Sequence, residues 1–268
     1  MRSSSNPAFR NLPQGQGYAT FDRSGGMDAG MGAAYADAQG APVDPGRAGV
    51  AERPITIDDV VTKTAIAAGT AIVTGTLTVV SGLYGLALPA FIVGFIVSLV
   101  LIFKPHLAKA PLVLLYSAAM GVALGGISGL LNNVYPGIAL QAIVGTAGVF
   151  IGMLIVYKTG AVRVTPRFTK WLLGAMVGVI VLLLFNLVMS LFGINTGLRD
   201  GGPVAIIFSL LIIGVAAFSL LLDFDMADQA VRAGAPAKFA WYIAFGLMTT
   251  LVWLYIEILR LLTYLRQD

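Results

Sequence analysis

Acidic residues within apolar sequence are the places where this chain could do chemistry. Asp223, Asp225 and Asp228 follow a long apolar run, and Glu257 lies in a second run that carries no charge back to Lys238. A charged side chain inside a membrane is costly, so an acid placed there indicates an ion or proton pathway by default. These acids are therefore the first candidates for a functional site.

One acid from each run gives the candidate site. Two carboxyls that meet in a low-dielectric interior share a proton, and such a pair can open or close with pH. When both are ionised, their oxygens suit a hard cation such as Ca²⁺. We predict that Asp225 and Glu257 form a pH sensor and gate, with these two side chains as Ca²⁺ ligands. Asp223 points about 200° away from Asp225 on a helix, so Asp223 is the alternative partner of Glu257.

Two simpler interpretations compete with this prediction. Arg260 follows Glu257 by three residues, a spacing that places both on one helix face, so Arg260 is a candidate counter-ion that would neutralise Glu257. The three aspartates would then be only the solvated end of a helix. The sequence leaves these alternatives open.

Composition sets the class of protein. The 268 residues are 57% hydrophobic and 11% charged, and the mean hydropathy is +0.86, whereas a soluble domain is about 25% charged. There is no cysteine and only one histidine, so we predict no catalytic residues, no enzyme activity and no resident cofactor. The net charge of +4 is spread over loops, which argues against a nucleic-acid partner. The expected environment is a lipid bilayer, and the oligomeric state stays undetermined.

The charge-free gaps predict an all-α fold, a polytopic membrane bundle of seven transmembrane helices. Each gap holds at least one span of about 20 apolar residues, and glycine and proline punctuate the ends. Residues 1–55 are rich in small and polar residues and are predicted to be a disordered cytoplasmic tail, while residues 56–268 form the seven-helix transmembrane domain. The predicted spans are about 62–82, 85–103, 111–131, 136–157, 168–192, 203–223 and 240–262.

The distribution of lysine and arginine predicts the orientation. Alternate loops are basic, and the loops between them hold only Arg199, beside Asp200. The positive-inside rule then places the N-terminus in the cytoplasm. Seven full spans would put Arg260 and Arg266 on the opposite side, in conflict with that rule. The last segment is therefore either a central helix whose charges face the bundle or a helix that does not cross fully.

Two local patterns predict structure. Thr56 and Asp59 have the spacing of a capping box at a helix start. Gly121, Gly125 and Gly129 recur every four residues, a stripe that suits close packing of two membrane helices.

Three segments carry a resemblance to a known family. Residues 240–262, from Ala240-Trp241-Tyr242 to Leu261-Leu262, together with Phe224-Asp225 and the segment 56–60 (Thr-Ile-Asp-Asp-Val), resemble the Bax inhibitor-1 family of transmembrane Bax inhibitor motif proteins. The likeness is closest to its bacterial, mostly actinobacterial, branch and covers roughly residues 54–266.

The resemblance implies a pH-sensitive Ca²⁺ leak in the bacterial plasma (inner) membrane. In it, Phe224-Asp225 matches the first acid of the family and Glu257 the second, although the family usually has aspartate at the second position. If the sixth span ends near Arg232 and the seventh starts near Ala240, a rise of 1.5 Å per residue places Asp225 about 11 Å and Glu257 about 26 Å from those helix ends. These unequal depths are the reason for retaining Asp223 as the alternative.

A different class of function stays open as well. The protein would not transport ions but would bind and regulate a membrane protein partner, such as a membrane protease, through residues 1–55. No internal repeat supports a secondary transporter, and one histidine does not supply an intramembrane enzyme.

Overall fold

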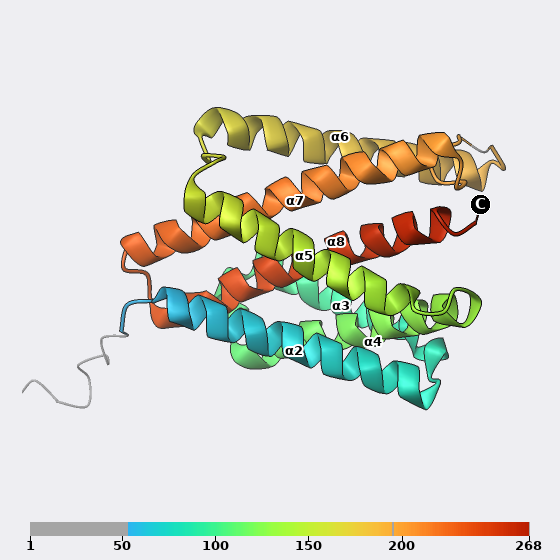
Figure 1. Ribbon diagram of the computed structural model, residues 1–268. Helices are drawn as coiled ribbons and strands as arrows, with labels where there is room; N and C mark the ends of the chain where they lie inside the picture. Colours follow the sequence, from blue (N-terminus) through green and yellow to red (C-terminus); the bar gives the residue numbers. More distant parts are fainter. Residues whose placement is uncertain (1–52, 195, 268) are drawn as a thin grey trace, which may run out of the picture. The chain divides into compact units, whose positions relative to one another are not determined.

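The structure is a computed structural model that describes residues 53–194 and 196–267. Seven helices in this part of the chain are long and apolar enough to cross a membrane, which confirms the all-α membrane fold (Figure 1). Short 3₁₀ turns at Tyr84–Leu86, Pro105–Leu107 and Ala237–Phe239 join some of them. The helices are α2 (Ile57–Ser81), α3 (Ala87–Phe103), α4 (Ala110–Val134), α5 (Ile138–Thr159), α6 (Pro166–Leu191), α7 (Pro203–Arg232) and α8 (Ala240–Tyr264).

The sixth helix extends beyond the membrane span that the sequence predicted. That span, 203–223, lies within α7, which continues to Arg232, the helix end assumed in comparing the depths of Asp225 and Glu257. Asp228 and Arg232 form an i,i+4 ion pair of 2.7 Å in the added turns, and polar residues of this kind prolong a helix beyond its apolar part. Gly234, with φ of +64°, follows the end of the helix.

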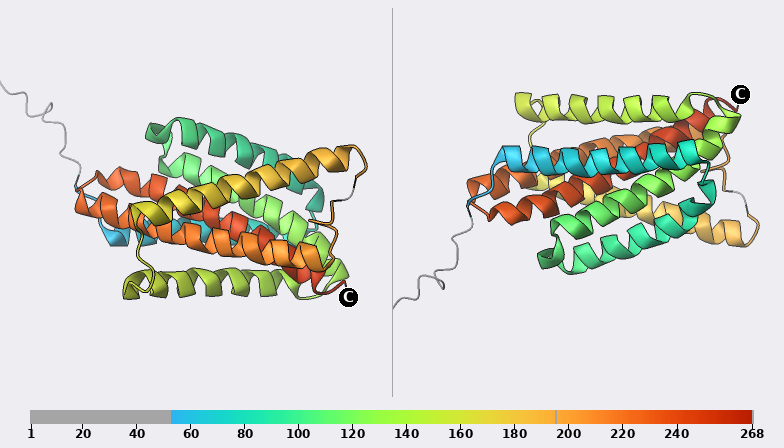
Figure 2. Two further views of the ribbon diagram at one scale, coloured as in Figure 1. Left: turned by 90° about the horizontal axis from the view of Figure 1, so that it is seen from above. Right: turned by 90° about the horizontal axis from the view of Figure 1, so that it is seen from below.

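The last helix, α8, lies at the centre of the bundle. It packs against α2, α4, α5 and α7, and the views in Figure 2 show these helices around it. One end of α8 lies beside the start of α2, and at the other end the Tyr264 hydroxyl donates to the Arg199 carbonyl. Of the two interpretations of this segment, the contacts of α8 favour the central helix.

Backbone hydrogen bonds join residues 53–55, just before α2, to the α7–α8 turn. The Ile55 amide donates to the Ala235 carbonyl at 2.7 Å, and the Ala237 amide donates to the Arg53 carbonyl at 3.0 Å. Lys63 also donates to the Ala237 carbonyl. Residues 53–55, which the sequence assigned to the tail, therefore belong to the bundle, because they satisfy backbone groups of the α7–α8 turn. The rest of the predicted tail, residues 1–52, lies outside the described residues.

The predicted capping box is confirmed at the start of α2. The Thr56 hydroxyl accepts a hydrogen bond from the Asp59 amide, and the Asp59 carboxylate accepts from the Thr56 amide. Arg53 donates to both oxygens of the same carboxylate at 2.6 and 2.8 Å, and this bond and charge raise the pKa of Arg53. Arg53 is largely exposed, so the ion pair adds little stability and the cap and backbone bonds hold the segment.

The glycine stripe on α4 packs as predicted. A Cβ atom added at Gly125 would lie 2.6 Å from the Gly75 Cα atom, and one added at Gly121 would lie 2.7 Å from the Ala71 Cα atom. The backbones of α2 and α4 thus approach too closely for a side chain. Gly129 of the same stripe faces the Tyr84 ring.

We predict that Gly125→Ala destabilises the protein, because the opposing atoms are backbone atoms that cannot turn aside. Overpacking of this kind costs about 1–3 kcal/mol. The matched control is Gly148→Ala on α5, where nothing lies within 4 Å of the added Cβ. Thermal unfolding of the purified proteins in detergent measures both, and equal Tm values for the two variants would contradict this packing.

Candidate functional site

Glu257 is a buried carboxylate held by two guanidinium groups. Its residue is only 2% exposed, and Arg260, one turn later on α8, donates from Nη1 to Oε2 at 3.0 Å. The Arg199 Nη2 atom lies 3.7 Å from Oε1. The predicted counter-ion role of Arg260 is therefore seen in the structure, and Arg199 adds a second positive charge. Burying a carboxylate in a membrane protein is tolerable when it is neutralised in this way.

Arg199 is the site residue that the sequence did not identify. It comes from the loop between α6 and α7, and its carbonyl accepts from the Tyr264 hydroxyl of α8 at 3.3 Å. The signal was its isolation, since it is the one basic residue between Lys170 and Arg232. The sequence assigned Arg199 only to a loop, and the fold turns its side chain inward to Glu257.

Asp223 forms a separate polar contact between α7 and α8. The Thr250 hydroxyl of α8 donates to Asp223 Oδ2 at 2.7 Å. The carboxylate also lies close to Gly246, one turn earlier on α8, because a Cβ added there would lie 3.9 Å from Oδ1, an ordinary contact distance. Asp223 is therefore the acid of α7 that faces the central helix.

The other two aspartates bond within their own helix. Asp225 accepts from Gln229, four residues later, and Asp228 pairs with Arg232. Asp225 was the first choice as partner of Glu257, but Gln229, which donates to it, lies on α7 and not on α8. This follows from the helix period, which turns Asp225 away from the face that carries Asp223.

The structure does not bring the predicted carboxyls together. Thr250, the partner of Asp223, precedes Glu257 by two turns, which is about 10 Å along α8 at 1.5 Å per residue. α7 and α8 are antiparallel and joined by a short turn, so residues meet when they lie equally far from that turn. Asp223 meets Thr250 on this basis, while Glu257 lies deeper and reaches the loop that precedes α7.

The geometry also bears on the predicted Ca²⁺ ligands Asp225 and Glu257. Over residues 53–194 and 196–267, no three His, Cys, Asp or Glu side chains gather in a way that could hold a metal ion. Asp223 and Glu257 instead have separate partners. Asp223 accepts from Thr250 of α8, whereas Glu257 pairs with Arg260 and Arg199.

A comparison with family profiles identifies the protein at this point. The profile described as Bax inhibitor 1 like matches residues 6–267, which include all seven helices and both Asp223 and Glu257. The chain belongs to the Bax inhibitor 1 like family. The match begins at residue 6 and so extends further toward the N-terminus than the resemblance seen in the sequence. Comparison with curated proteins gives no match.

As a member of the Bax inhibitor 1 like family, the protein is an integral membrane protein with acids in its last two helices. The Phe224-Asp225 segment resembled the first acidic position of the family. In this chain Phe224 is buried and packs edge-on against Phe150 of α5 at 5.5 Å between ring centroids. The residue before it, Asp223, is the one that contacts α8.

We predict that Glu257→Gln destabilises the protein by about 3–5 kcal/mol, the usual cost of removing one partner of a buried ion pair. The variant would leave Arg260 and Arg199 without their shared negative charge. Asp225→Asn is the matched control, because it also neutralises one acid but leaves the two arginines paired. Thermal unfolding in detergent measures the effect, and an equal Tm for the two variants would show that the ion pair is not structural.

Proposed function

We propose that this protein is a pH-sensitive cation leak channel for Ca²⁺ in the bacterial plasma (inner) membrane. The observation that carries the proposal is Asp223, an acid within the α7 span that faces the central helix α8. Intramembrane acids of this kind mark ion pathways. Membership of the Bax inhibitor 1 like family supports the proposal, since the sequence resemblance to that family implied such a leak.

The proposed pathway follows the α7–α8 interface. An ionised Asp223 attracts a hard cation, and the Thr250 hydroxyl lies beside it as a further oxygen ligand. Glu257 is the next acid along α8, and in this structure Arg260 and Arg199 occupy its oxygens. We infer that the structure represents a closed state, in which these two arginines prevent the cation from binding to the Glu257 carboxylate.

The proposal assigns proton sensing to the two acids separately. Direct sharing of one proton would need α8 to slide by two turns past α7, and the bonds at both ends of α8 oppose such a movement. Protonation of Asp223 removes the charge that attracts the cation, so the leak should increase as pH rises and Asp223 ionises. Protonation of Glu257 removes the charge that holds Arg199 and Arg260.

The orientation is part of the same proposal. Lysine and arginine gather at the start of α2 and in the α3–α4, α5–α6 and α7–α8 connections. The connections between these are poor in lysine and arginine. The positive-inside rule then places the start of α2 in the cytoplasm. Glu257 and its arginines lie toward the opposite face, and Asp223 lies closer to the cytoplasmic end.

A liposome assay tests the leak. We expect Ca²⁺ entry into liposomes that contain the protein and a trapped Ca²⁺ dye, with a rate that increases as rising pH ionises Asp223. Asp223→Asn should lower the rate about tenfold at the higher pH, the effect of about 1.4 kcal/mol of lost attraction, and should remove the part of the pH dependence that Asp223 contributes, while the part due to Glu257 remains. Asp225→Asn, two residues away on another face, should leave both unchanged.

The assay also separates the leak from the alternative function. Absence of Ca²⁺ entry at every pH, with an ionophore control that does admit Ca²⁺, would contradict the channel and favour a non-transporting regulator of a membrane protein partner such as a protease. The observation behind this alternative is that the chain before residue 53 continues directly into the segment bonded to the α7–α8 turn. In that case deletion of residues 1–52 would abolish capture of the partner.

A further inference from the structure

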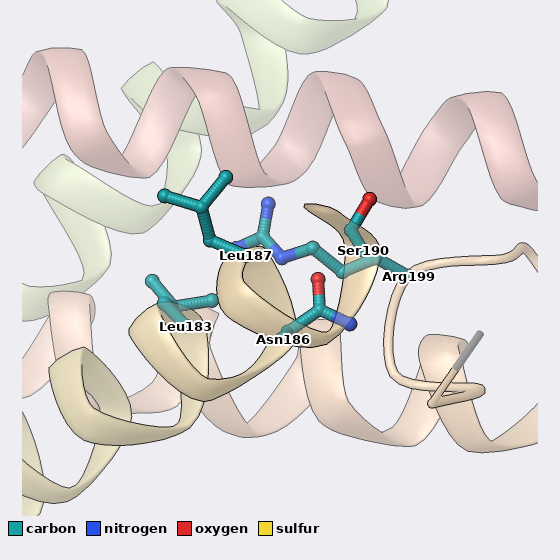
Figure 3. Close-up of a pocket in the computed structure, with 5 residues that line it drawn as sticks. All are labelled: Leu183, Asn186, Leu187, Ser190 and Arg199. Atoms are coloured by element: carbon teal, nitrogen blue, oxygen red, sulfur yellow. The ribbon is translucent and has the colours of Figure 1, made fainter. Parts of the chain in front are cut away.

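A pocket opens between the end of α6 and the loop that leads to α7. Its volume is about 240 Å³, and Figure 3 shows the side chains that line it, Leu183, Asn186, Leu187, Ser190 and Arg199. A second hollow of about 300 Å³ adjoins it, and Asn186, Ser190 and Arg199 line both. The second hollow adds Gly193, Ile194 and Asp200. The two hollows therefore form one continuous concave site with an arginine in common.

Arg199 has a donor at this site that lacks a partner. Its Nε atom is buried and makes no hydrogen bond to the described part of the protein. Its Nη2 atom is 3.7 Å from Glu257, which is an ion-pair distance but too long for a hydrogen bond. Buried donors in proteins are almost always satisfied. The Arg199 side chain is also 24% exposed and lines both hollows, so its guanidinium can donate to a further acceptor there.

The walls of the pocket are apolar on one side and polar on the other. Leu183 and Leu187 are four residues apart and lie on one face of α6, and Asn186 and Ser190 repeat that spacing beside them. The helix around them is strongly apolar and exposed, with Leu184 at 55% and Leu191 at 78%. Because α6 ends at Leu191, this wall lies where a membrane span meets the headgroup region.

Charge decides which headgroup fits. Arg199 lines both hollows, while Asp200 lines only the second and places a negative charge at that end of the site. The nearby pair of Glu257 and Arg260 is already neutral. The site thus has one positive and one negative end, which complements a zwitterion better than a ligand of net negative charge.

We propose that this pocket binds a phospholipid whose headgroup carries a phosphate and a primary ammonium, the phosphatidylethanolamine class. The phosphate oxygens accept from Arg199 and from the Ser190 hydroxyl, since arginine binds phosphate through charge-assisted hydrogen bonds. The ammonium lies at Asp200 in the adjoining hollow, and an acyl chain follows Leu183 and Leu187 along α6. The binding is non-covalent and independent of whether the protein conducts ions.

Native mass spectrometry of the purified full chain tests the site. The protein is incubated in detergent with an equimolar mixture of phosphatidylethanolamine, phosphatidylglycerol and phosphatidylcholine, and the retained lipid is identified by mass. We expect one phosphatidylethanolamine to be retained in preference to the other two. Arg199→Gln should lower that retention about tenfold, the effect of losing one charge-assisted hydrogen bond, while Arg266→Gln at the same end of the bundle should not.

Two further variants keep the test decisive. Ser190→Trp fills the pocket from an exposed position without touching the Glu257 ion pair, so it tests the site even if Arg199→Gln fails to fold. Asp200→Asn should remove the preference for phosphatidylethanolamine over phosphatidylglycerol. Equal retention of the three lipids by the wild type, or undiminished retention by Ser190→Trp, would overturn the proposal.

Discussion

The neutralisation of Glu257 is the constraint on which the rest of the bundle depends. α8 is surrounded by four other helices, and a carboxylate at 2% exposure in such a helix costs several kcal/mol unless it is paired. Arg260 from the same helix and Arg199 from the α6–α7 loop supply the pairing. The loop is therefore fixed to the end of α8, and α6 and α7 must enter the membrane from that place.

The opposite end of α8 is fixed by backbone bonds. Residues 53–55 pair with the α7–α8 turn, and Lys63 lies 5.7 Å from the centre of the Trp241 ring while its ammonium donates to the turn. With both ends of α8 held, the register between α7 and α8 is set. That register places Asp223 against Thr250 and leaves Glu257 two turns away along α8. The acids of the two helices therefore lie at different depths and have different partners.

Local signals in the sequence predicted local structure well. The capping box spans only the four residues from Thr56 to Asp59, and the glycine stripe on α4 depends only on helical spacing. Both could therefore be predicted without knowing the fold. The Glu257–Arg260 pair was foreseen for the same reason. The predicted membrane span of 203–223 followed hydropathy, whereas the helix α7 continues through polar residues to Arg232.

Contacts between distant elements were not predictable in the same way. The approach of Arg199 to Glu257 depends on the path of a loop, and the bond from Thr250 to Asp223 depends on the α7–α8 register. The unequal depths of Asp225 and Glu257 already indicated a mismatch, and Asp223 was retained for that reason. Only the fold shows that each acid has its own partner.

The central claim is that Asp223 and Glu257 are separate sites and not one proton-sharing pair. Infrared difference spectra of the protein in lipid, recorded through a pH titration, report the carbonyl band of each protonated carboxyl. The account predicts that Asp223→Asn removes one titrating band and leaves the midpoint of the Glu257 band unchanged. A shift in the Glu257 midpoint in that variant would show that the two carboxyls are coupled and would contradict the account.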